Sequence, residues 1–171
     1  MRNIAGDGEM SSMSDDEARE PDDDVAGVLA PPPAIFAVAL AAGLALGNAG
    51  ITRKRSCDVI AGGTIAVLGA ALGLATISAL KRAGTNVRPD RPTTALVTSG
   101  PFRYTRNPAY VAATMLYIGA ALGARSVPAL TFLPIALVVL ERGVVEREER
   151  YLERRFSDAY RAYKGTVPRW F

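Results

Sequence analysis

The stretch VIAGGTIAVLGAALGLATISAL, residues 59–80, decides the fold of this chain. It contains no charged side chain and is built mainly from alanine, glycine, leucine and isoleucine. A helix rises about 1.5 Å per residue, so a run of this length is long enough to cross the hydrocarbon core of a bilayer. The stretch therefore predicts a membrane-spanning helix.

Three more apolar runs lie before and after it, at 34–51, 109–124 and 127–140. The last two are short and are separated by the turn sequence GARS, so we expect them to form a helical hairpin whose second arm is kinked near Pro134. The four runs together predict an all-α integral membrane protein with about four transmembrane helices.

Small residues recur four positions apart in two of these runs, at Gly43 and Gly47 and at Gly69 and Gly73. Such spacing lets the backbones of two helices approach closely in lipid. The alternative, which stays open, is that glycine is simply common in membrane helices.

Charge divides the chain into two parts. Residues 1–30 carry nine acidic side chains and two arginines with few apolar residues, which is typical of a disordered tail and not of a signal peptide. Residues 31–171 carry eighteen basic and eight acidic side chains and hold all four apolar runs. We therefore expect a disordered acidic tail at 1–30 and one membrane-embedded domain at 31–171.

The distribution of lysine and arginine predicts the orientation. Four crossings place both termini and the polar connector 81–107 on one side of the membrane, together with sixteen of the twenty basic residues. Positive charge marks the cytoplasmic face, so we expect both termini to be cytoplasmic, in the inner or cell membrane. The other side would hold Arg125 and the basic cluster 53–55, and this cluster argues against the assignment.

The chain has no histidine and a single cysteine, Cys57. This composition excludes serine–histidine and cysteine–histidine triads, most zinc sites and an internal disulfide, and we expect no metal. The basic residues flank apolar runs instead of forming one soluble patch. That pattern favours membrane lipid, and not nucleic acid, as the partner.

From residue 141 onward the sequence predicts an amphipathic cytoplasmic helix. Apolar residues recur there at intervals of seven, four, three and four, which places them on one stripe. The stripe consists of Val145, Leu152, Phe156, Ala159 and Tyr163.

One position of this stripe, between Val145 and Leu152, is occupied by Glu149. Neither Glu149 nor Glu148 has a cation three or four residues away on its own helix. A carboxylate on a buried face needs a partner from elsewhere, because burying an unpaired charge is costly. We expect Glu149 to be the inward residue. Two alternatives stay open: a small rotation of the helix would turn Glu148 inward in its place, or both carboxylates would face water.

The stretch SGPFRYTRNPAY, residues 99–110, offers such partners beside the start of the third apolar run. Asparagine is a favoured N-cap and proline a favoured first helical residue, so Asn107 and Pro108 predict a helix start. The free N–H groups of that start would attract an anion. We expect Arg103 and Arg106 to face the glutamates of the tail helix.

Two tyrosines, Tyr104 and Tyr110, belong to the same stretch. Their rings are able to hold a flat base or a sulfonium. With the arginines and the glutamates they predict a pocket at the membrane–cytoplasm boundary that has cationic, anionic and aromatic walls.

Two motifs carry a resemblance to a known group. LVTSGPFRYTRNPAY, an apolar hairpin and EREERYLERRFSDAYRAYKGTVPRWF together resemble the isoprenylcysteine carboxyl methyltransferase and phospholipid methyltransferase superfamily, most of all its short bacterial members. The resemblance covers about residues 59–171, so it spans most of the membrane-embedded domain. It implies an integral membrane enzyme that uses S-adenosylmethionine.

The resemblance also implies which residues hold the cofactor. These are Arg106, Asn107, Pro108, Tyr110, Glu148 and Glu149. We add Tyr104 as a cofactor-binding candidate for its ring, and we take Arg106 and Glu149 as the candidate catalytic residues.

The sequence departs from the family at two positions. Eukaryotic carboxyl methyltransferases have histidine in place of Asn107, whereas short bacterial relatives often have asparagine, and the phenylalanine–glycine pair of the tail helix is here Phe156–Ser157, which we expect to be a minor change.

Methyl transfer to a carboxylate or thiol of a lipophilic or small substrate is the function that we expect. A carboxylate needs an arginine to hold it, whereas a phospholipid amine must first lose a proton, and the chain has no histidine to take it. Three alternatives stay open: N-methylation of a phospholipid amine, hydride transfer from NADPH as in sterol reductases, and a non-enzymatic small membrane protein that retains the pocket.

Overall fold

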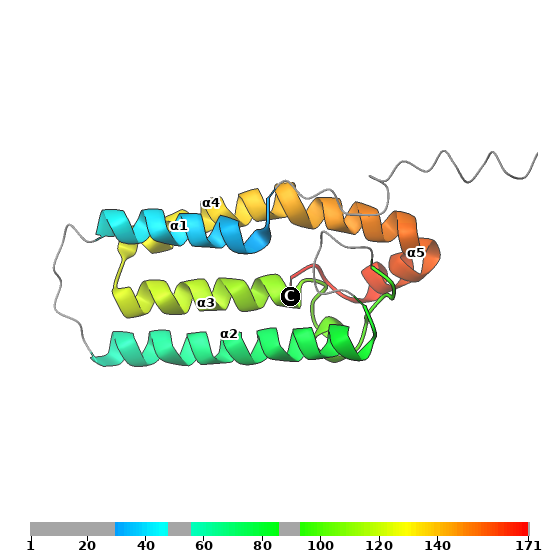
Figure 1. Ribbon diagram of the computed structural model, residues 1–171, viewed down its shortest axis with the longest axis horizontal. Coiled ribbons are helices and arrows are strands. Elements are labelled where there is room, and N and C mark those ends of the chain that lie inside the picture. The colour runs from blue at the N-terminus through cyan, green and yellow to red at the C-terminus, as the bar shows by residue number, and fades with distance from the viewer. Residues whose placement is uncertain (1–29, 48–55, 86–92, 171) are drawn as a thin grey trace, which may run out of the picture.

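The computed structural model describes residues 30–47, 56–85 and 93–170, and within these ranges every regular element is helical (Figure 1). The elements are α1 Pro32–Gly47, α2 Ser56–Arg82, a 3-10 turn Gly100–Arg103, α3 Pro108–Ala124, α4 Val127–Leu140, a π-helical turn Glu141–Val145 and α5 Glu146–Thr166. The all-α class and the helices expected from the apolar runs are confirmed. Residues 1–29 of the expected tail and the cluster 53–55 lie outside the described residues.

The first four long helices form two packed pairs. Helix α1 lies along α4, and α2 lies along α3, so that the four run side by side in Figure 1. The expected hairpin of α3 and α4 turns at Arg125, which has a left-handed backbone, and at Ser126, whose hydroxyl caps α4 by accepting a hydrogen bond from Ala129. Helix α4 continues through Pro134, where we expected a kink, and the α-helical geometry first changes at the π turn.

Glycines bring the backbones of the paired helices together. A methyl group at Gly119 would lie 2.6 Å from the carbonyl oxygen of Gly62, and one at Gly69 would lie 3.0 Å from that of Ala112. At Gly43 an added methyl would overlap the backbone of Ala129. The expected close approach is therefore confirmed at Gly43 and Gly69.

The other two expected glycines behave differently. A methyl at Gly47 would clash with the Ser126 hydroxyl, whereas at Gly73 it would only reach ordinary contact, 3.6 Å from the Ala112 side chain. The pair formed by Gly62 and Gly119 was not anticipated from the spacing of four residues.

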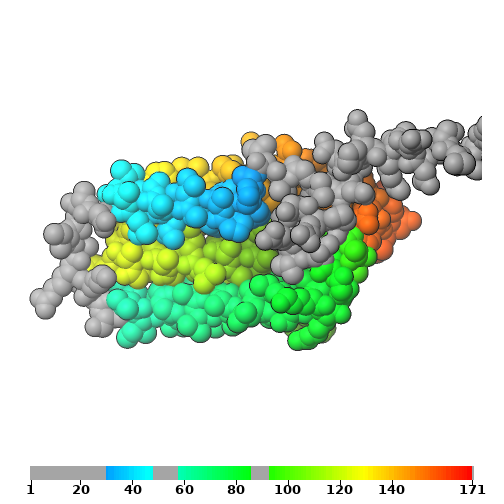
Figure 2. Space-filling view, viewed as in Figure 1, coloured from blue at the N-terminus to red at the C-terminus, as the bar shows by residue number. Residues whose placement is uncertain are grey.

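Two helical stretches, Asp58–Arg82 and Val127–Thr166, are long and apolar enough to cross a membrane. Only 17% and 28% of their most apolar windows are buried, whereas the core helix of a soluble protein would bury most of such a window. Two shorter apolar helices, α1 and α3, accompany them, and the helices lie as parallel bands on the face shown in Figure 2. Outward-facing apolar side chains of this kind suit a lipid environment.

The tail helix does not continue straight. At Ser157 the backbone has φ 43° and ψ −114°, which is not helical. Glu153 and Lys164 form an ion pair of 3.2 Å, although eleven residues of straight helix would separate them by about 16 Å. The helix therefore folds back at Ser157.

This fold-back corrects two expectations. Ala159 is exposed and its neighbour Tyr160 is 1% exposed, so Tyr160 replaces Ala159 in the buried stripe because the backbone turns at Ser157. The replacement of the family's glycine by Ser157 is not a minor change, since this backbone conformation is one that glycine adopts without strain and serine does not.

Candidate functional site

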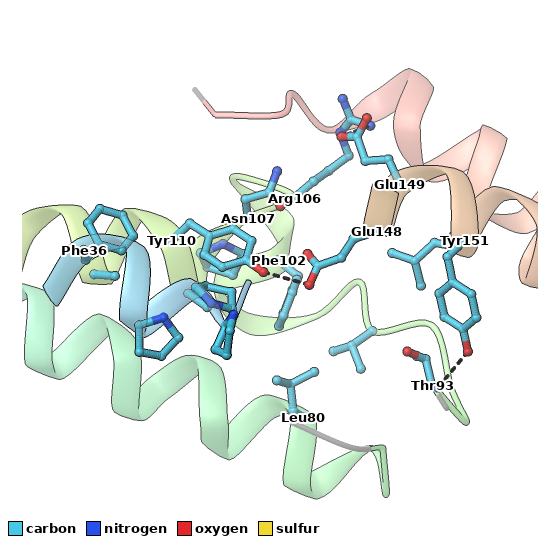
Figure 3. Close-up of a pocket in the computed structure, with 18 of the residues that line it drawn as sticks. Phe36, Leu80, Thr93, Phe102, Arg106, Asn107, Tyr110, Glu148, Glu149 and Tyr151 are labelled. Carbon is cyan, nitrogen blue, oxygen red and sulfur yellow. Dashed lines mark hydrogen bonds and ion pairs between the residues drawn. The ribbon is translucent and has the colours of Figure 1, made fainter. Parts of the chain in front are cut away.

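A cavity of about 1360 Å³ lies where α5, the 93–107 connector and the beginnings of α1 and α3 meet (Figure 3). Its charged lining residues are Arg106, Glu148 and Glu149. The rest of the wall is mostly apolar and is contributed by α1 and α3, with Phe36 and Leu40 among its residues. One space thus joins a charged end to an apolar wall.

Glu149 is the most heavily paired group of the charged end. Its side chain is 8% exposed, and its Oε1 lies 3.0 Å from Nη1 of Arg106. Both carboxylate oxygens also accept hydrogen bonds from Arg169, from Nε at 3.1 Å and from Nη2 at 2.7 Å. The expected inward position and the expected partner Arg106 are confirmed, whereas Arg169 was not foreseen.

Arg169 is held by a second carboxylate. Its Nη1 donates to Oε1 of Glu141 at 2.7 Å. The hydrogen bonds to Glu149, followed by those to Glu141, raise the pKa of the Arg169 guanidinium above its ordinary value. Two arginines and two glutamates therefore balance each other in charge beside the cavity.

Glu148 lies apart from this network. Its carboxylate accepts a 2.7 Å hydrogen bond from the Tyr110 hydroxyl, and Figure 3 shows the two side chains meeting across the cavity. Burial raises the pKa of Glu148 to about 7; the Tyr110 hydrogen bond lowers it, and the nearby charge of Glu149 adds to the rise. Both glutamates line the cavity, so the expectation that only one of them faces inward is wrong.

Arg106 reaches the cavity with donors to spare. Its side chain is 10% exposed, and neither Nε nor Nη1 has a hydrogen-bond partner among the described residues, although Nη1 is at ion-pair distance from Glu149. Unpaired buried donors cost free energy unless a ligand or water completes them. Donors of this kind suit an anionic group.

Asn107 and Pro108 occupy the cap and first position of α3, as expected. The Asn107 side chain makes no capping hydrogen bond, however. Its Nδ2 donates instead to the backbone carbonyl of Arg169 at 3.1 Å. Both residues line the cavity, and Asn107 also fastens the C-terminal segment to it.

Tyr104 and Arg103 lie elsewhere. Tyr104 is 70% exposed, Arg103 is exposed, and neither is among the residues that line the cavity. The geometry therefore lends no support to a cofactor contact from Tyr104 or to a pairing of Arg103 with the glutamates.

Tyr151 and Tyr163 hold the connector in place through contacts that the sequence did not predict, although Tyr163 was expected on the apolar stripe. The Tyr163 hydroxyl donates to the carbonyl of Phe102 at 2.7 Å, and the Tyr151 hydroxyl accepts from the amide of Thr93 at 3.0 Å. These contacts link residues about sixty positions apart. No local periodicity in the sequence could have shown them.

Comparison with known proteins agrees with this geometry. A family model for phospholipid methyltransferase matches residues 57–159, from the beginning of α2 to just beyond the bend in α5. The chain belongs to this family. The resemblance drawn from the two sequence motifs is thereby confirmed. Searches of curated proteins and of solved structures gave no significant match.

The range that matches the phospholipid methyltransferase family contains most of the residues that line the cavity, but not all of them. The match includes Arg106, Tyr110 and both glutamates. It leaves out α1, which forms part of the apolar wall, and Arg169, which holds Glu149. Within the described residues, no cluster of three potential metal ligands was found.

Proposed function

We propose that this protein is a membrane-bound enzyme that transfers a methyl group from S-adenosylmethionine to the polar group of a lipophilic substrate. The observation that carries the proposal is the single cavity that joins three charged side chains, one of them buried, to a long apolar wall. A lipophilic substrate can lie along the wall while its polar group reaches Arg106, Glu148 and Glu149.

The charged end fits the cofactor. S-adenosylmethionine carries a carboxylate, an ammonium and a sulfonium, and it supplies a methyl group that is activated by the sulfonium charge. The unpaired donors of Arg106 suit the carboxylate, and the carboxylates of Glu148 and Glu149 suit the two cationic groups. Asn107, Pro108 and Tyr110 line the same space.

An amine is the nucleophile that the charges favour. Arg106 is the sole cation in the wall of the described cavity, so a cofactor carboxylate bound there leaves no second cation for a substrate carboxylate. The sequence favoured a carboxylate or thiol because the chain has no histidine to take the proton of an amine, which left only a glutamate, an aspartate or a tyrosine as the base. Glu148 supplies such a base, because its pKa of about 7 lets it accept a proton near neutral pH.

The proposed step then balances. The substrate ammonium gives a proton to the Glu148 carboxylate, and the nitrogen lone pair attacks the methyl carbon. When bound, S-adenosylmethionine would supply the methyl group, and the electrons of its carbon–sulfur bond would stay on the sulfur as a thioether. Glu148 returns the proton to water. Tyr110 holds the carboxylate by its 2.7 Å hydrogen bond.

The cavity end of the bundle is the proposed cytoplasmic end. It gathers the connector, α5 and both described chain ends in Figure 1, and it carries most of the basic residues. Four crossings by α1 to α4 place Arg125 and its ion-pair partner Asp58, 2.8 Å away, at the opposite face. A cysteine placed at position 165 in a Cys57-free background should be labelled only after the cell is opened, and labelling from outside the cell would contradict the orientation.

Cofactor binding tests the function. The purified full chain in detergent should be thermally stabilised by S-adenosylhomocysteine and not by NADPH. Stabilisation by NADPH alone would support the sterol-reductase alternative, and no response to either would support a non-enzymatic role. Labelled methyl transfer to an aminophospholipid, compared with a fatty acid and a long-chain thiol, then identifies the nucleophile.

A further inference from the structure

The C-terminal segment after α5 lies directly against the cofactor site that we have proposed, and the following inference rests on that function. We propose that residues 167–170 form a strap that holds Arg106, Asn107 and Glu149 in place at this site. In this proposal Arg169 is a positioning residue, which orients Glu149 and thereby keeps Arg106 available to the ligand.

The backbone of the strap is fastened to the start of α3 by three hydrogen bonds. The amide of Arg106 donates to the carbonyl of Pro168 at 3.0 Å. The carbonyl of Arg169 accepts from the Thr105 hydroxyl at 2.8 Å and from Nδ2 of Asn107 at 3.1 Å. Arg106 and Asn107, which carry proposed cofactor contacts, are therefore also residues that hold the strap.

The side chain of Arg169 completes the arrangement. It grips both oxygens of Glu149 and reaches Glu141 with its remaining nitrogen. A planar guanidinium that binds both oxygens fixes the rotation of the carboxylate as well as its position. A lysine could not do this, because an ammonium is a point donor.

This grip explains the free donors of Arg106. Because Arg169 satisfies Glu149, Arg106 stays at ion-pair distance from that carboxylate without spending Nε and Nη1 on hydrogen bonds. Without Arg169, the nearest cation left to Glu149 is Arg106, which would then turn its donors away from the cavity. Arg169 thus acts on the ligand through both residues.

The contact between Arg169 and Glu149 depends on the fold-back of α5. Arg169 follows Glu149 by twenty residues, and it returns only because α5 reverses at Ser157 and because Tyr163 ties the returning arm to Phe102 at 2.7 Å. The strap also lies outside the residues 57–159 that match the family.

Trp170 makes the strap directly observable. It is the sole tryptophan of the chain, it follows Arg169, and it packs partly buried against the helical core. Its fluorescence therefore reports whether the strap is docked, with or without a ligand. An undocked strap would expose the indole to water, which shifts the emission to longer wavelength and increases quenching by iodide.

The experiment compares Arg169→Gln with Arg161→Gln in the full chain in detergent. Arg161 is also on the returning arm, but its ion pairs are with exposed side chains, and its own side chain is 63% exposed. We expect Arg169→Gln to weaken S-adenosylhomocysteine binding at least tenfold in isothermal titration and to raise the iodide quenching of Trp170. Arg161→Gln should leave both unchanged, and Arg169→Lys should recover only part of the affinity.

A double-mutant cycle separates positioning from general stability. If Arg169 acts through Glu149, the double variant Glu149→Gln, Arg169→Gln should bind no more weakly than Glu149→Gln alone. Additive losses, or unchanged affinity in Arg169→Gln, would overturn the positioning role. Unchanged quenching of Trp170 in Arg169→Gln would overturn the strap.

A milder variant covers the case in which Arg169→Gln fails to fold. Glu141→Gln removes one anchor of Arg169 and leaves Glu149 paired, so affinity should fall by a smaller factor in the same direction. No change in either affinity or quenching would contradict the proposal. If the unaltered chain binds no S-adenosylhomocysteine, the proposed function fails, while Trp170 quenching in the variants still decides whether the strap exists.

Discussion

The helical bundle and the α5 end of the molecule are held together by different physics. Between α2 and α3 the contact is backbone to backbone, at glycines such as Gly62 and Gly119 that leave no room for a methyl group. At the α5 end the contacts are buried charges, with Glu149 gripped by two arginines. Close packing of backbones therefore holds the helical bundle together, and ion pairs hold the α5 end together.

The difference follows from what surrounds each region. In a bilayer the surrounding lipid is as apolar as the side chains, so helices gain little free energy by burying apolar surface against each other. They associate through close packing of small residues instead. Where water reaches the protein, it competes for polar groups, and buried ion pairs persist only where several hydrogen bonds hold them. A substitution should therefore act through volume in the bundle and through charge at the α5 end.

A single methyl group should break the bundle. Gly119→Ala places a Cβ within 2.9 Å of the Gly62 carbonyl oxygen and the Ala66 backbone, whereas Gly123→Ala, one turn later on α3, meets nothing within 4 Å. Both changes gain the same helix propensity, so their difference isolates the clash. We expect Gly119→Ala to be less stable than Gly123→Ala by about 3 kcal/mol in detergent unfolding. Equal stability of the two would show that α2 and α3 can separate without cost.

Removing one charge should act on ligand binding instead. Glu149→Gln keeps the shape of a side chain that is 8% exposed, yet it removes the charge shared by Arg106 and Arg169. We expect S-adenosylhomocysteine affinity to fall by roughly 1–3 kcal/mol, the scale of a charged hydrogen bond lost at a buried site. Glu153→Gln, whose ion pairs are exposed, should change little. Equal small effects from both would remove Glu149 from the site.

The sequence predicted the helices well because each of them is marked locally. The run 59–80 is apolar and long, and Asn107–Pro108 is a helix start that needs no knowledge of the rest of the fold. Glu149 was also visible, because it interrupts an apolar stripe and has no cation on its own helix.

The remainder depended on contacts that no local pattern contains. A glycine such as Gly119 looks like any other until the helix opposite it is known. Arg169 reaches Glu149 only after the chain reverses at Ser157, and a serine by itself does not indicate a backbone that favours glycine; the glycine of the family at this position was the one signal. Glu148 and Glu149 looked like alternatives because neighbouring residues of a helix point about 100° apart, whereas the cavity is wide enough for both of them to line it.

The stability of the protein should depend on pH through Glu148. Its pKa is about 7 in the folded chain and 4.5 ordinarily, so between these values the folded state binds more protons than the unfolded state. Stability from this group is therefore present at low pH and is lost as the pH rises through 7. Relative to Glu148→Gln, which does not titrate, the unaltered chain should lose about 1.3 kcal/mol of unfolding free energy between pH 6 and pH 8.

Paired unfolding curves at the two pH values measure this difference. Tyr110→Phe, which removes the hydrogen bond that lowers the pKa of Glu148, should move the midpoint of the pH dependence upward. A stability difference that stays constant between pH 6 and pH 8 would mean that Glu148 is ionised throughout, and its proposed role as a base would fail.

The smallest change should be a gain. Ser157 has φ 43° at the reversal of α5, a conformation that costs a side-chain-bearing residue energy and that glycine adopts freely. Its side chain is exposed, so no contact of the hydroxyl compensates for this strain in the way that a buried hydrogen bond would. We expect Ser157→Gly to raise the unfolding free energy by about 0.5–1 kcal/mol and to leave S-adenosylhomocysteine affinity equal or slightly higher, because the returning arm carries Arg169.

Ser157→Ala is the matched control, since it removes the hydroxyl and keeps the Cβ. If alanine stabilises the protein as much as glycine does, the strain lies in the hydroxyl and not in the backbone, and the reversal at this position owes nothing to the conformational freedom of glycine.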